Sequence, residues 1–147
     1  DAYDALSPSM KRYLDGMTAV HSADGASFEK LHTDDQSKQD DIQDARQTMN
    51  EVEHPVVRTH PVTGRKALYV NAIFTERLRS VPRRESKMVL DYLVDHIKTP
   101  EFSCRFRWQK NSIAFWDNRC TQHYAIADYG DSHRLMHRVT INGDRPV

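Results

Sequence analysis

The stretch at residues 113–138, IAFWDNRCTQHYAIADYGDSHRLMHR, decides how the rest of the sequence is interpreted. Apolar residues alternate at its start, the polar cluster Asp117-Asn118-Arg119 follows, and Val-Thr-Ile at residues 139–141 comes directly after it. Alternation over a few residues is typical of a half-buried strand. The stretch therefore predicts two short strands joined by a turn-rich loop, with His123 on the first and Arg138 fifteen residues later.

These two side chains together suggest a particular chemistry. An imidazole is a good ligand for Fe, Zn or Cu, and a guanidinium binds a carboxylate through two parallel hydrogen bonds. The pair favours a metal that shares its site with a carboxylate-bearing cosubstrate. From the residues alone, ordinary alternatives stay open: His123 as a half-buried histidine bonded to the backbone, and Arg138 as a surface or salt-bridge arginine.

The residues before this stretch predict two helices. Ser7 followed by Pro8 is a typical helix start, and the expected apolar face of this helix consists of Met10, Tyr13, Leu14 and Met17. A second helix is expected to start at residues 80–82 and to end at Ile97, before Thr99-Pro100. Its expected apolar face consists of Met88, Val89, Tyr92, Leu93 and His96.

Short strands make up most of the remaining predicted structure. We expect a strand at residues 18–21 and a hairpin whose strands cover residues 54–59 and 66–70 around a Pro/Gly turn. Two further strands are expected at 102–108 and 113–117, with a turn at 109–112 and one buried face. Residues 71–78 are interpreted as a connector, and the polar residues 22–51 as a mobile lid or polar segment. Six or seven strands with two or three helices predict a mainly β fold with flanking helices.

Composition narrows the class of function. Lys plus Arg and Asp plus Glu number 21 each, so bulk charge favours neither nucleic acid nor an anionic membrane. No apolar run approaches membrane-spanning length. Cys104 and Cys120 are too few for a disulfide scaffold and are expected to be reduced thiols in a cytoplasmic protein. The first residue is Asp rather than Met, which is expected of a processed or truncated product.

Several segments resemble one known family. WDNRCTQHYAIADY at residues 116–129 and RLMHRVTINGDRP at 134–146 are similar to the C-terminal signature of the TauD/TfdA (taurine dioxygenase) family, which are non-haem Fe(II) oxygenases that use 2-oxoglutarate. The resemblance continues through residues 54–71, 100–118 and YDALSP at 3–8. It implies a double-stranded β-helix (jelly roll), of which these residues would supply the C-terminal portion of a single domain.

The resemblance also implies roles for individual residues. His123 matches the family's distal iron ligand, and Arg138 matches the arginine that binds the distal carboxylate of 2-oxoglutarate. Arg134 is a second candidate for that carboxylate, with a solvated loop charge as its alternative. Phe74 resembles a position lining the primary-substrate pocket, with ordinary core packing as its alternative. No residue is assigned as an acid–base catalyst.

The other two iron ligands of the family form a His-x-Asp pair ahead of the segment that resembles YDALSP. His32-Thr33-Asp34 has this form but follows that segment, so we interpret it as a chance match. His21 with Asp24 is interpreted as structural. A working site would then need upstream residues or a second chain.

The expected function is hydroxylation of a small, anionic, sulfonate-type substrate, with succinate and CO2 as co-products. The sequence leaves the oligomeric state open, and the resemblance allows a homo-oligomer because members of the family are often dimers or tetramers. The alternative is a truncated or degenerate family member that acts as a non-catalytic binding module.

Overall fold

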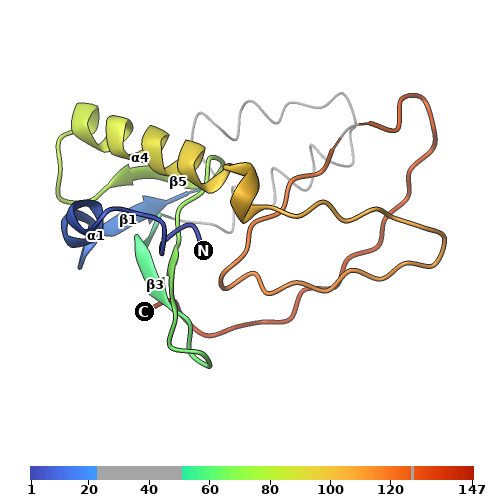
Figure 1. Cartoon of the computed structure of the whole chain (residues 1–147), viewed down its shortest axis with the longest axis horizontal. Helices are drawn as coiled ribbons and strands as arrows, with labels where there is room; N and C mark the ends of the chain where they lie inside the picture. The colour runs from blue at the N-terminus through green and yellow to red at the C-terminus, as the bar shows by residue number, and fades with distance from the viewer. Residues whose placement is uncertain (23–50, 127) are drawn as a thin grey trace.

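The structure, a computed structural model, describes residues 1–22, 51–126 and 128–147. It has two parts: a packed N-terminal unit of short helices and strands, and a C-terminal arm, defined as residues 103–147, that loops away from the unit (Figure 1). The predicted lid at 22–51 lies, apart from its two end residues, outside the described residues. The elements in chain order are α1 (Pro8–Leu14), β1 (Thr18–His21), β2 (Val52–Pro55), β3 (Val57–Thr59), β4 (Lys66–Leu68), β5 (Thr75–Leu78), α4 (Arg83–Ile97) and the 3-10 helix η1 (Pro100–Phe102).

Two antiparallel sheets form the β part of the unit. β1 lies between β2 and β5, and β3 pairs with β4. In the first sheet Ala19 lies opposite both His54 and Leu78. The strand at 18–21 is thus confirmed, and the hairpin is confirmed for β3 and β4 around its Pro/Gly turn. The single strand predicted at 54–59 is wrong, because β2 ends at Pro55 and pairs with β1, whereas β3 begins at Val57 in the other sheet. The interpretation of residues 71–78 as a connector is wrong for Thr75–Leu78. The sequence shows no apolar alternation here, because Glu76 and Arg77 are charged and only one of the four strand residues, Leu78, is buried.

The helix α1 begins as predicted at Ser7. The Ser7 side chain accepts a hydrogen bond from the backbone N–H of Met10 at 3.1 Å, and Pro8 occupies the first turn. This pairing satisfies one of the amides that a helix start leaves without a partner. The helix buries Leu14 completely, and Gly16, with φ +71°, turns the chain toward β1.

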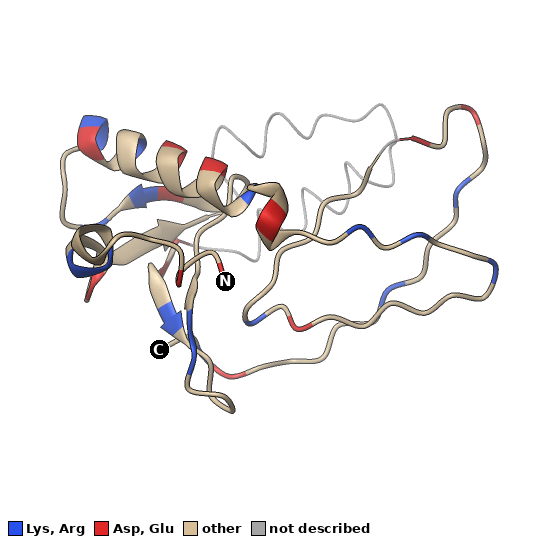
Figure 2. Cartoon of the chain, viewed as in Figure 1, with Lys and Arg blue, Asp and Glu red and all other residues tan. Residues whose placement is uncertain are grey.

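The helix α4 lies over β5 and differs from the prediction in the face it buries. Ser86, Leu90 and Leu93 point into the unit, whereas Met88 and Tyr92 lie on the exposed side. Charged residues follow the outer side of the helix (Figure 2). The burial follows the spacing of Ser86, Leu90 and Leu93, which places these residues on one stripe. The hydroxyl of Ser86 accepts a hydrogen bond from the Leu78 amide at 2.8 Å, which joins the helix to β5.

One apolar core lies between the helices and the sheets. Val56, Val70, Leu78 and Leu93 are each at most 1% exposed. The other buried members are Leu6, Leu14, Ala19, Leu68 and Leu90. No helix in the part of the chain that the structure describes combines the length and apolar character needed to cross a bilayer.

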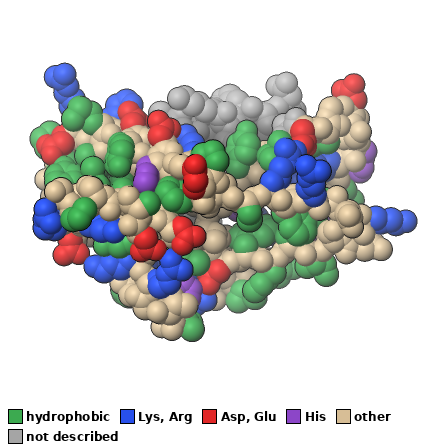
Figure 3. Space-filling view, viewed as in Figure 1, with side chains coloured by type: hydrophobic (Ala, Val, Ile, Leu, Met, Phe, Trp, Pro, Cys, Tyr) green, Lys and Arg blue, Asp and Glu red, His purple; other side chains and the backbone are tan. Residues whose placement is uncertain are grey.

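The C-terminal arm departs most from the prediction. Its described residues contain no helix or strand, so the strands predicted at 102–108, 113–117 and 139–141 are wrong for this structure, although the turn at 109–112 is confirmed by a hydrogen bond from Ser112 N to Gln109 O at 3.0 Å. Apolar side chains of the arm face solvent, with Ile113 89% and Phe115 87% exposed (Figure 3). Alternation determines which side chains share a face but does not supply a strand to pair with.

Candidate active-site residues

His123, the predicted metal ligand, lies on the arm after a compact turn. Its ring is exposed and contacts the indole of Trp116, with ring centroids 4.9 Å apart. The preceding residue, Gln122, donates from Nε2 to the carbonyl of Val70 at 2.6 Å. The imidazole is therefore held near the β3–β4 hairpin while its nitrogens make no hydrogen bond with any described residue.

The two candidate arginines also lie on the arm and are exposed. The guanidinium of Arg134 lies over the ring of Tyr129, 5.5 Å from its centroid. Neither Arg134 nor Arg138 forms an ion pair with a described carboxylate, which distinguishes them from Arg105, whose guanidinium pairs with Asp128. Both guanidinium groups are thus available for an external anion.

Phe74, the predicted substrate contact, belongs to the N-terminal unit. It is half-buried just before β5, where its carbonyl accepts a hydrogen bond from Ser22 N and its amide donates to the side chain of Asn71. The contacts of the described residues do not bring Phe74, His123, Arg134 and Arg138 together. Their grouping in one site stays a prediction.

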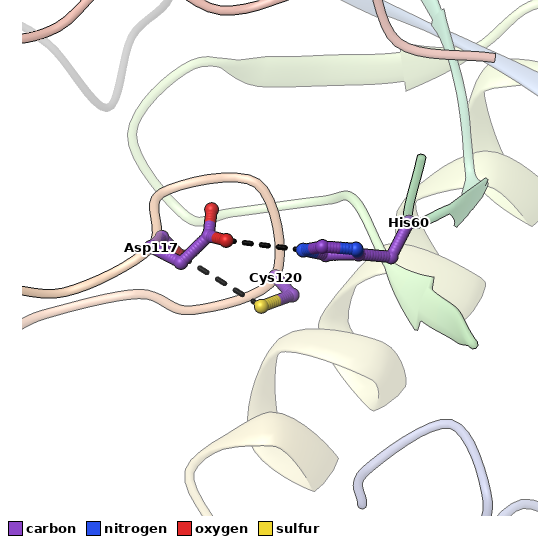
Figure 4. Close-up of side chains that lie close together, drawn as sticks. All are labelled: His60, Asp117 and Cys120. Atoms are coloured by element: carbon purple, nitrogen blue, oxygen red, sulfur yellow. Dashed lines mark hydrogen bonds and ion pairs between the residues drawn. The ribbon is translucent and has the colours of Figure 1, made fainter. Parts of the chain in front are cut away.

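The structure shows one cluster that the sequence did not predict. His60, which follows β3, has its Nε2 3.0 Å from Oδ2 of Asp117 (Figure 4). Arg119 donates to the same carboxylate from its Nε and Nη2 atoms. Arg119 and then His60 hold the pKa of the Asp117 carboxyl well below its ordinary value. The ligand atoms of His60, Asp117 and Cys120 all lie within 4.8 Å of one another. Local patterns could not reveal this group because His60 and Asp117 are separated by 57 positions.

A second histidine cluster lies in the unit, with His21 buried and His54 half-buried. His21 and His54 pack edge to face with centroids 5.1 Å apart, and both rings contact Tyr69. Burial, and then the neighbouring His54, lowers the pKa of His21 to about 4. Burial, followed by Arg145 and Arg58, lowers the pKa of His54. Both rings are therefore neutral at pH 7 and pack as core groups, which agrees with the structural interpretation of His21.

Comparisons with known proteins show which family the chain resembles. The family model described as "Taurine catabolism dioxygenase TauD, TfdA family" matches residues 1–140. An alpha-ketoglutarate-dependent sulfate ester dioxygenase from Pseudomonas putida is 36% identical over 155 residues, covering 99% of this chain and 48% of that protein. An alpha-ketoglutarate-dependent sulfonate dioxygenase from Saccharomyces cerevisiae is 32% identical over 149 residues, covering 100% of this chain and 34% of that protein. The chain thus spans between about a third and a half of the length of these relatives.

Solved structures agree with the sequence comparisons. The crystal structure of a taurine dioxygenase from Burkholderia xenovorans superposes with a TM-score of 0.55 at 32% identity, covering 74% of this chain and 31% of that one. This likeness confirms the predicted fold class, mainly β with flanking helices in the manner of the double-stranded β-helix of these dioxygenases. The family model covers nearly the whole sequence, and the chain therefore belongs to the TauD/TfdA family of taurine catabolism dioxygenases.

Proposed function

We propose that the protein is an Fe(II)- and 2-oxoglutarate-dependent oxygenase that hydroxylates a small, anionic, sulfonate-type substrate, with succinate and CO2 as co-products. Membership in the family carries the proposal, and the relatives named as sulfonate and sulfate ester dioxygenases support the substrate class. Within the matched region the sequence keeps both His123 and Arg138, the two residues that this chemistry requires from its C-terminal part.

The surroundings of His123 suit a metal ligand. A neutral imidazole offers a lone pair to Fe(II) when no hydrogen bond occupies it, and the His123 ring has no such bond with the described residues. A facial triad needs two more ligands. His32 and Asp34, the one His-x-Asp pair of the sequence, lie outside the described residues. Bound iron would supply the activation of oxygen and the oxidation of the substrate.

The arginines and Phe74 would orient the organic partners. Arg138 would bind the distal carboxylate of 2-oxoglutarate through its planar pair of donors, with Arg134 as the second candidate. The lack of an ion pair between either side chain and a described acid supports this role. Phe74 would contribute apolar surface to the substrate pocket, which is the usual composition of such pockets.

The organisation of the protein follows from the same proposal. Residues 1–147 would form the C-terminal portion of a single dioxygenase domain, in which further strands cover the exposed apolar residues of the arm, and residues 22–51 would act as a lid. The partner would be a small molecule rather than nucleic acid or a membrane. The protein would be cytoplasmic and would assemble as a homo-oligomer.

The test is succinate formation by the purified protein with iron, 2-oxoglutarate and taurine or a short alkyl sulfonate. His123→Ala removes a metal ligand and is expected to lower the rate by more than about a hundredfold, because loss of a mere supporting partner of a ligand already costs about 10–100-fold. Arg138→Gln removes a charge-assisted pair of hydrogen bonds, and we expect the KM for 2-oxoglutarate to rise by about 10–100-fold. Arg84→Gln, on the exposed side of α4, is the matched control and is expected to change neither quantity.

Either of two results would overturn the proposal. One is succinate formation that survives in His123→Ala. The other is a wild-type protein that binds neither iron nor 2-oxoglutarate, which would favour the non-catalytic binding module instead.

A further inference from the structure

The C-terminal arm carries His123, yet its described residues form no strand. Its end is joined to β3 by a backbone hydrogen bond from Thr59 N to the Val147 carbonyl at 2.9 Å, whereas side-chain contacts hold the part of the arm around His123. Two of them join it to the β3–β4 hairpin. His60 bonds to the carboxylate of Asp117 at 3.0 Å, and Gln122 donates to the Val70 carbonyl at 2.6 Å. Asp117 lies six residues before His123 and Gln122 lies immediately before it. These two contacts therefore hold the two ends of the segment 117–122, which positions the imidazole.

His60 is a rigid anchor because the backbone of its own turn holds its ring. Its Nδ1 accepts hydrogen bonds from the amides of Val62 and Thr63, both at 3.2 Å. Its own amide donates to the carbonyl of Arg65 at 2.8 Å, and the residue is only 8% exposed. The ring thus has one orientation, with Nε2 directed at the arm.

The same geometry fixes the position of the ring proton. Nδ1 faces two N–H donors and must present its lone pair, so the proton of the neutral ring lies on Nε2. Nε2–H then donates to Oδ2 of Asp117 (Figure 4). Nε2 has no lone pair left for a metal, which argues against a second metal centre at His60, Asp117 and Cys120. The cluster is better explained as a tether.

Asp117 is the residue that organises the turn before His123. Its Oδ1 accepts from the Arg119 amide at 2.9 Å, and its backbone carbonyl accepts from Thr121 N at 3.0 Å and Thr121 Oγ1 at 2.6 Å. Arg119 donates to both carboxylate oxygens, with 2.9 Å from Nε to Oδ1 and 2.8 Å from Nη2 to Oδ2. The turn keeps its shape through these local bonds and its place through His60.

Trp116 connects this turn to the imidazole. Its indole N–H donates to Oδ1 of Asn118 at 2.8 Å, and its ring lies against His123. The position of the indole depends on the Asp117 turn because Trp116 and Asn118 directly flank Asp117. Movement of the turn away from His60 would move the surface on which His123 rests.

We propose that His60 is a positioning residue for the iron ligand: its Nε2–H holds the Asp117 turn against the β3–β4 hairpin and thereby sets the orientation of the His123 ring. The inference rests on the proposed function for the identity of the metal. Its geometric content, the dependence of the Trp116–His123 contact on the His60–Asp117 bond, can be tested without metal. Ligand groups must be held within about 0.5 Å of their working position, so loss of the tether should weaken metal binding.

A matched pair of substitutions at His60 separates the tether from the turn. His60→Gln places an amide N–H at about the reach of Nε2 and can still donate to Asp117. His60→Asn is shorter: its amide oxygen can accept from Val62 and Thr63, but it does not reach the carboxylate. Asp117→Asn is the second variant, because it leaves one acceptor oxygen, with two lone pairs, for the donors that His60 and Arg119 direct at the two oxygens of Asp117. Arg105→Gln breaks a different ion pair of the arm and serves as the control.

Two measurements on the full chain then decide. The nuclear Overhauser effect between the ring protons of Trp116 and His123, recorded without metal, is expected to disappear in His60→Asn and Asp117→Asn and to persist in His60→Gln and Arg105→Gln. The Kd for Mn(II), measured by electron paramagnetic resonance, is expected to rise by roughly tenfold in the first two variants and to change by less than about threefold in the others.

The outcomes keep this proposal apart from the proposed function. A ring contact that persists in His60→Asn and Asp117→Asn overturns the positioning role, even if Mn(II) binding depends on His123. Equal loss of the ring contact in His60→Gln and His60→Asn also overturns it. A side chain that can donate to Asp117 would then hold the turn no better than one that cannot. If His123→Ala leaves Mn(II) binding unchanged, only the assignment of His123 as an iron ligand is refuted. Loss of the ring contact in His60→Asn would still support the tether between His60 and Asp117.

Discussion

Acidification from pH 7 to pH 4 should destabilise the N-terminal unit through His21. Burial lowers the pKa of His21 to about 4 from its ordinary value of 6.5. Between these two values the unfolded chain binds a proton on His21 that the folded chain does not bind, so the free energy of unfolding falls as the pH falls. The interval corresponds to about 3 kcal/mol at most, and solvent relaxation around the ring reduces the expected loss to about 1–2 kcal/mol.

Other groups with shifted pKa values among the described residues act in the same direction or outside this interval. The pKa of His54 is also lowered by burial and by the positive charges of Arg145 and Arg58, so its protonation adds to the loss. The lowered pKa values of the carboxyls of Asp117 and Asp4 take effect only below their ordinary value of 3.8. The window between about pH 4 and 6.5 therefore reports mainly on the buried histidines.

The assay is urea unfolding followed by circular dichroism at a series of pH values, for the wild type and for His21→Gln. Glutamine does not titrate, so the variant should show a flatter dependence of the free energy of unfolding on pH, whatever its stability at pH 7. The slope rather than the absolute stability is the readout, since a buried amide has its own cost. Parallel curves for the two proteins between pH 4 and 6.5 would refute the assignment to His21.

Three further predictions concern the packing and hydrogen bonds that stabilise the unit, and each is measured by urea unfolding at pH 7. Leu93→Ala, at a fully buried site, should cost about 2–5 kcal/mol, whereas Ile113→Ala, at an 89% exposed site, should change stability by less than about 0.5 kcal/mol; similar losses at both sites would mean that the arm is packed. Ser7→Ala removes the helix cap and should cost about 1 kcal/mol, so an unchanged midpoint would contradict the capping role. Ser86→Ala leaves the buried Leu78 amide without its acceptor and should cost about 1–3 kcal/mol, and a neutral result would show that water replaces the hydroxyl.

Local signals in the sequence predicted the elements that depend on neighbouring residues. The cap at Ser7 and the hairpin around Gly64 were predictable because a few adjacent residues determine both structures. The strand Thr75–Leu78 was missed because its identity depends on pairing with β1, more than fifty positions earlier in the sequence. The buried face of α4 was predicted only in part, since the exposed Met88 and Tyr92 are as apolar as the residues that pack.

For the candidate site, the sequence indicates which residue types are present, whereas only the structure shows which residues lie in contact. Residue type left the ordinary alternatives for His123 and Arg138 open, and their roles toward a metal and a carboxylate follow from the resemblance to the family and stay a prediction. The bond between His60 and Asp117 could not be predicted, because neither residue type nor spacing marks a contact across 57 positions. Hydrogen-bond geometry, including the two amides at Nδ1, was needed to distinguish a tether from a metal site.

The N-terminal unit and the C-terminal arm differ in how they are stabilised. The N-terminal unit has a closed core and maintains itself through contacts such as Ser86 with Leu78. The arm carries His123, Arg134 and Arg138 but has no core of its own among the described residues. The residues for which we propose a chemical role thus lie where the chain stabilises itself least, and their geometry depends on a few polar contacts with the stable unit. A substitution in the unit that leaves folding intact but breaks one of these contacts, such as His60→Asn, should therefore affect metal binding more than stability.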